Sequence, residues 1–201
     1  MVFSSDTNIN NSGSNKGVII AHNSGSVNVY GSNCCIISSL LPDIIKALSD
    51  ICSIEEGDVS AINLEEYTVE EKIAYNHVIK HKENIELYAA YWRHCDQYLN
   101  ELDNIFVGNK KKIMRLIVKI YSEVKGQILL DNRNSGKEDI LLIQENADKI
   151  IDSVISNIRI HISQANNLSN LGLEDLVLGT TCLVAYFFVE CKILERPHDC
   201  K

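Results

Sequence analysis

The histidines and one cysteine between residues 77 and 95 are the best candidates for metal chemistry. His77 and His81 are four residues apart, and on a helix this spacing lets two imidazoles bind one zinc ion. His94 and Cys95 would lie about 20 Å further along the same straight helix, so they could not complete that site. His81 and Cys95 also fit the apolar face of a helix. The sequence therefore favours neither a bound metal nor any other cofactor.

Residues for nucleophilic or phosphate chemistry are not combined in a recognisable pattern. No histidine stands at a readable spacing from a serine or cysteine with an acidic partner. The glycines at 13 and 17 lack the strand–loop–helix context of a phosphate-binding loop. Glu174 and Asp175 could pair with Glu190 as acid and base, but carboxylates that begin a helix also favour its dipole. We expect no catalytic residues and a protein that is not an enzyme.

Composition indicates a globular protein of one or two domains. The chain has 201 residues, of which 45% are hydrophobic, and its formal net charge of −8 argues against wholesale nucleic-acid binding as a function class. Seven cysteines follow no regular spacing, and the N-terminus has no basic and apolar signal sequence. A cytoplasmic protein with reduced cysteines is the simplest interpretation.

The first 35 residues differ from the rest because they are rich in Asn, Ser and Gly. The tetrapeptide NSGS occurs at 11–14 and again at 23–26, and each copy precedes a short apolar run. Such a leader could be disordered, but its strand-forming residues favour a β-hairpin or β-repeat that pairs with copies of itself. We therefore predict an oligomerisation leader at 1–35, followed by a helical domain at 36–201. The residues predicted to mediate oligomerisation are Val18, Ile19, Ile20, Val27, Val29 and Tyr30.

Helical periodicity dominates from residue 42 onward and predicts an all-α, five-helix antiparallel bundle. The first helix begins at Pro42 and ends near Cys52. Thr68 and Glu71 form a capping box that opens a long helix, which Gly108 ends. Further helices are expected at about 110–131, 140–162 and 171–197, separated by polar turns.

The long second helix carries apolar residues in a heptad pattern. Val78, Ile85, Trp92, Leu99 and Phe106 recur every seven residues. A second series, offset by three, begins at His81. This pattern predicts a seam that packs against a partner helix, which is a second reason to expect a homo-oligomer.

The last helix is apolar on every side from Leu176 to Val189 apart from Gly179 and two threonines. Such a helix must be buried all round. Fourteen residues are too few to span a membrane, which needs about 20. We therefore predict a central rod of the bundle, with Gly179 at a close helix crossing.

Three segments, 70–92, 110–121 and above all 173–197, resemble the C-terminal domain of bacterial ABC-three-component systems. The resemblance covers roughly residues 64–199. It implies a helical domain that docks an effector subunit to an SMC-like ABC ATPase and a small middle component in anti-phage defence. About 60 residues precede the resemblance, which leaves no room for the nuclease or protease usual in that position, so no enzymatic activity is carried over.

Two charged clusters are candidates for partner binding. Glu190, Lys192, Glu195 and Arg196 follow the buried rod, although they could simply solubilise a helix end. Lys110, Lys111, Lys112 and Arg115 form a basic run that could face a partner or solvent. We expect a non-catalytic assembly subunit that self-associates and docks to the ATPase or the middle component. The alternative is a stand-alone regulator, such as an antitoxin-like inhibitor or a sensor that binds one protein.

Overall fold

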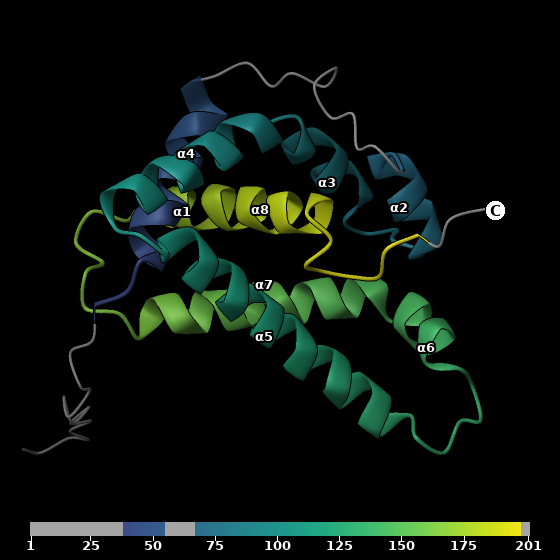
Figure 1. Ribbon diagram of the computed structural model, residues 1–201. Helices are drawn as coiled ribbons and strands as arrows, with labels where there is room; N and C mark the ends of the chain where they lie inside the picture. The colour runs from purple at the N-terminus through teal and green to yellow at the C-terminus, as the bar shows by residue number, and fades with distance from the viewer. Residues whose placement is uncertain (1–37, 55–66, 198–201) are drawn as a thin grey trace, which may run out of the picture. The chain divides into compact units, whose positions relative to one another are not determined.

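The computed structural model, shown in Figure 1, describes residues 38–54 and 67–197. Its regular structure is helical, which confirms the predicted mostly α character, but these residues form eight helices rather than the five predicted. The predicted β leader, its oligomerisation residues and the domain boundary after residue 35 lie outside the described residues. The helices are α1 (Leu41–Ile54), α2 (Val69–Tyr75), α3 (Lys82–Ala89), α4 (Trp92–Ile105), α5 (Asn109–Asp131), α6 (Asp139–Glu145), α7 (Ala147–Ser163) and α8 (Leu173–Val189).

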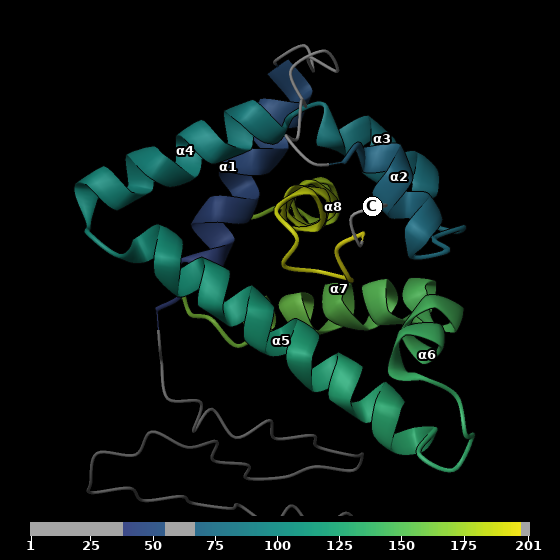
Figure 2. The same cartoon turned by 45° about the vertical axis from the view of Figure 1, so that its right-hand side comes forward.

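Helix α8 is the centre of the helical unit. Figure 2 shows it nearly end-on, with other helices around it, and it packs against α1, α3, α4 and α7. Every residue from Cys182 to Val189 is buried, because no side of this stretch carries a charged side chain. The predicted apolar rod is therefore confirmed from Cys182 to Val189, whereas nearer the start of α8 Val177 is 42% exposed. No helix among the described residues is long and apolar enough to cross a membrane.

Gly179 marks the closest approach of α8 to α1. A Cβ atom added there would lie 2.8 Å from the carbonyl carbon of Ile45, and closer still to its oxygen. Only a residue without a side chain allows the two backbones to come this near. The predicted close helix crossing at Gly179 is therefore confirmed, with α1 as the partner helix.

The predicted long helix from Thr68 to Phe106 is wrong: the chain forms α2, α3 and α4, separated by turns. The capping box that opens α2 is present, with Glu71 N–H donating to the Thr68 hydroxyl at 3.1 Å. At the first break His77 has a positive φ of 54°, and Asp148 accepts hydrogen bonds from the backbone N–H groups of residues 79, 80 and 81. These tertiary contacts hold a turn that periodicity alone does not reveal.

The breaks also change the interpretation of the heptad seam. Val78, Ile85 and Leu99 are buried within the chain, where α3 and α4 pack on α8. Phe106 instead follows the end of α4 and is 68% exposed. No second chain is needed to cover the seam, so it no longer supports self-association.

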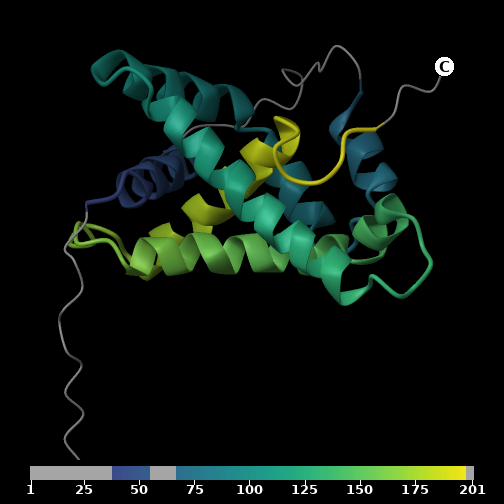
Figure 3. The same cartoon turned by 60° about the horizontal axis from the view of Figure 1, so that its bottom comes forward.

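Two further helix boundaries differ from the prediction. Asn146 separates α6 from α7, and its side-chain amide donates to the Leu142 carbonyl at 2.8 Å. Helix α8 ends at Val189 rather than near Pro197. In Figures 1 and 3, α5 runs diagonally across α7.

Candidate interaction site

The segment from Glu190 to Arg196 folds back on the end of α8 instead of extending it. Lys192 N–H donates to the Phe187 carbonyl at 2.9 Å, and both Cys191 and Leu194 have positive φ angles. Ile193 and Leu194 are buried, which anchors the turn in the core. The charged residues here are therefore presented by a tight turn and not by a helix.

The two acidic residues of this segment are held by internal partners. Trp92 Nε1 donates to Glu190 at 2.8 Å. Glu195 accepts from the Tyr121 hydroxyl at 2.7 Å and pairs with Lys125 at 2.6 Å. Burial would raise the pKa of Glu195, but Lys125 and Tyr121 outweigh it and lower that pKa.

Asn76 also forms hydrogen bonds with the backbone of Glu195. Its side-chain amide donates to the Glu195 carbonyl at 2.8 Å and accepts from the Glu195 N–H at 3.0 Å. This fully buried asparagine joins the turn after α2 to the turn after α8. Glu195 therefore helps to hold the fold together, which sequence patterns did not indicate.

A buried lysine completes this end of α8. The Lys72 side chain is fully buried and donates to the Phe188 carbonyl and, at 3.0 Å, to the Ile193 carbonyl. Carbonyls at the end of a helix lack intrahelical donors, and a cation there also suits the helix dipole. Burial lowers the pKa of Lys72 to about 8. No pattern in the sequence marked Lys72 as a buried residue.

Exposure distinguishes the four predicted docking residues that follow α8. Glu190 and Glu195 face internal donors, Lys192 is half-buried, and Arg196 is exposed. The Arg196 guanidinium lies 5.7 Å from the centre of the Tyr67 ring, close enough for a cation–π contact.

The predicted basic run occupies the first turns of α5. The Lys110 ammonium pairs with Asp96 at 2.6 Å, so this lysine is used within the fold. Lys111, Lys112 and Arg115 are exposed, and no carboxylate among the described residues pairs with them. The run therefore offers three cations to solvent or to a partner.

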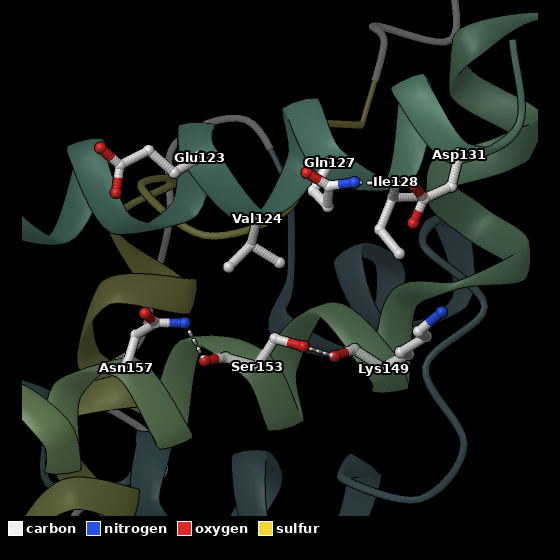
Figure 4. Close-up of a pocket in the computed structure, with 8 residues that line it drawn as sticks. All are labelled: Glu123, Val124, Gln127, Ile128, Asp131, Lys149, Ser153 and Asn157. Carbon is white, nitrogen blue, oxygen red and sulfur yellow. Dashed lines mark hydrogen bonds between the residues drawn. The ribbon is translucent and has the colours of Figure 1, made fainter.

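A shallow cleft of about 330 Å³ separates the second half of α5 from α7 (Figure 4). Val124 and Ile128 point into it, and polar side chains line its edges. Several of these are bonded along their own helices: the Ser153 hydroxyl donates to the Lys149 carbonyl, and Asn157 donates to the Ser153 carbonyl. The cleft brings few free polar groups together for ligand binding.

The residues proposed for metal or acid–base chemistry are dispersed. His77 is in the turn after α2, whereas His81 precedes α3 and its Nε2 lies 2.9 Å from Asp152, so the two do not share a helix face. Asp175 and Glu190 stand at opposite ends of α8, about 22 Å apart at 1.5 Å per residue. Within residues 38–54 and 67–197, no three His, Cys, Asp or Glu side chains come together to hold a metal.

Buried thiols are part of the core. Cys95 and Cys182 lie with their sulfur atoms 3.3 Å apart where α4 meets α8, and both are fully buried. Hydrogen bonds with the neighbouring Cys52 and Cys95 thiols, together with burial, raise the pKa of Cys182. A thiol held in its neutral form is a poor nucleophile, so these cysteines act as small core residues.

Comparison with protein families identifies the domain. Residues 40–195 match the family model described as C-terminal domain 10 of the ABC-three component (ABC-3C) systems. The chain belongs to this ABC-3C domain family. The ABC-3C match begins beside α1 and ends at Glu195, so it includes all eight helices and the turn that closes α8. No curated protein and no solved structure matches the chain.

Proposed function

We propose that this protein is a non-catalytic docking and assembly subunit of an anti-phage ABC-3C complex. The observation that carries the proposal is the family match over residues 40–195, because an ABC-3C system has several components and so implies protein partners. The partners proposed are an SMC-like ABC ATPase and the middle component, and the proposed location is the cytoplasm.

The structure supports docking through pre-ordered surfaces. The backbone of the turn after α8 is fixed by Lys72 and Asn76, so the chain that carries its cations is already ordered. Rigid presentation lowers the entropic cost of binding. The proposed contact residues are the exposed or half-exposed cations Lys192, Arg196, Lys111, Lys112 and Arg115.

Self-association through the leader is a separate part of the proposal. The strand-forming residues between Val18 and Tyr30 would pair with those of other copies. Light scattering on the full chain and on a shortened chain that begins at Ser38 tests it. We expect a homo-oligomer that becomes smaller without the leader, and a monomeric full chain at tens of micromolar would contradict this part.

Co-expression with the ATPase and middle components of the same system tests the docking function. The tagged chain should retain at least one component through affinity purification and gel filtration. Failure of every component to co-elute would contradict the proposed function. Stoichiometric binding to one protein outside the system would instead favour a stand-alone regulator.

A further inference from the structure

The corner between α4 and α5 exposes three consecutive apolar side chains. Ile105, Phe106 and Val107 are 67%, 68% and 91% exposed. Figures 1, 2 and 3 all place this corner at the periphery of the helical unit. Single exposed apolar residues are common, but a contiguous group of this size is typical of an interaction surface. We call residues 105–107 the apolar tip.

The apolar tip is built on a rigid corner. The Asp103 carboxylate accepts hydrogen bonds from the N–H groups of Gly108 and Lys110, at 2.9 and 3.0 Å. Gly108 has a φ of 94°, a conformation that favours glycine. These contacts fix the turn, so the exposure of the tip is a property of an ordered structure.

A second set of contacts ties the corner to the core. The Asp96 carboxylate pairs with Lys110 and accepts from the Tyr186 hydroxyl of the buried α8 at 2.7 Å. Burial would raise the pKa of Asp96, but Lys110 and Tyr186 outweigh it and lower that pKa. Asp96 therefore connects the start of α5 to the buried helix α8.

The charge on the α5 side of the apolar tip is of one sign, whereas Asp103 on the α4 side is bonded within the corner. No acidic residue occurs between Asp103 and Glu123, and Lys111, Lys112 and Arg115 in the first turns of α5 are exposed without a carboxylate partner among the described residues. The whole chain carries a net charge of −8, so this face opposes the average charge of the molecule. Charge complementarity favours an acidic partner surface and disfavours a symmetric contact between this basic face and the same face of a second copy.

We propose that the α4–α5 corner docks into an apolar pocket rimmed by carboxylates on another protein component of the same ABC-3C system. This inference rests on the proposed function and specifies its contact site. The apolar tip would enter the pocket, while Lys111, Lys112 and Arg115 would meet the acidic rim. Burial of the apolar side chains supplies affinity, and the cations supply orientation and association rate.

The test measures binding of the full chain to the purified ATPase component and, separately, to the middle component. Replacement of Phe106 and Val107 by Ser should weaken binding to the docking component at least about 10-fold, as expected for an interface anchor. Lys111→Glu combined with Lys112→Glu should weaken it similarly and reduce its salt dependence. Because these side chains are exposed, the melting temperature should hold.

Matched controls come from exposed residues far from the corner in sequence. Leu87→Ser removes a 60% exposed apolar side chain from α3, and Arg133→Glu reverses an exposed charge after α5. Both should bind like the parent. Equal binding by the parent and both corner variants would refute the assignment of the corner as the docking site while leaving the proposed function intact.

Two further outcomes also decide the matter. If the parent binds neither component, the proposed function fails and the corner assignment fails with it. Sedimentation with phosphatidylserine vesicles tests whether the corner binds a membrane surface instead. If the parent sediments with them through Phe106 while the corner variants still bind the components normally, the occupant is a membrane surface and the protein-docking inference is overturned.

Discussion

Replacing Gly179 with Ala tests the packing of α1 on α8 directly. The added Cβ would approach Ile45 more closely than the 3.0 Å below which real Cβ contacts essentially do not occur, and the atoms it meets include backbone. The helices must then separate by on the order of 1 Å, which weakens dispersion contacts along the crossing. We expect a penalty near the upper end of about 1–3 kcal/mol for overpacking, offset by about 1 kcal/mol of helix propensity. The net loss should be about 2 kcal/mol.

Gly126 provides a matched control in α5. A Cβ added there meets nothing within 4 Å, so Gly126→Ala should stabilise the protein by about 0.5–1 kcal/mol. The midpoints of thermal and urea unfolding, followed by circular dichroism, should therefore shift in opposite directions for the two variants. For a protein of this size we expect Gly179→Ala to melt about 4–8 °C below the parent. If it melts with Gly126→Ala, at or above the parent, the proposed close crossing is wrong.

Three other predictions concern the end of α8. Phe187→Ala should lower the free energy of unfolding, measured in urea, by about 3–5 kcal/mol because the ring is fully buried. A variant as stable as the parent would indicate that the ring lies at the surface. Glu195→Gln should lower the melting temperature at pH 7, because Tyr121 and Lys125 lose their charged acceptor. Since the pKa of Glu195 is lowered on folding, this difference should begin to shrink as the pH falls below its ordinary value of 4.5 and be lost as the pH falls through the lower folded pKa. A constant difference would contradict the pairing. For Lys72, the folded pKa of about 8 lies below the unfolded value of 10.5, so the unfolded chain holds more protons between them. The free energy of unfolding of the parent, relative to that of Lys72→Met, should therefore rise from pH 8 to 9.5. A difference between the two proteins that does not change with pH would count against burial of the amine.

The sequence predicted those features that depend on neighbours along the chain. The capping box of Thr68 and Glu71 uses groups three residues apart, and the structure has it as expected. The buried rod was predictable because a helix without a polar face has only one stable environment. Gly179 stood out as the one residue without a side chain in that rod, and the structure confirms its close approach to α1.

Of the candidate site, the sequence identified charged residues but not their roles. Glu195 and Lys110 were predicted as partner-binding residues, and the structure gives each an internal ion pair. The exposed cations Lys111 and Arg115 were equally visible in the sequence, yet nothing in their spacing separated them from Lys110. Burial and pairing distance make that distinction, and both depend on helices far apart in the chain.

Tertiary structure decided where the helices break and what the apolar residues face. A heptad pattern placed Phe106 on a buried seam, but the turns at His77 and Tyr91 redirect α3 and α4 onto α8 and leave Phe106 at an exposed corner. Lys72 is buried because it meets backbone carbonyls 116 and 121 residues further along the chain. Periodicity records only which residues share a face of a local helix. Which faces meet, and which polar groups find partners, depends on contacts that form when the whole chain folds.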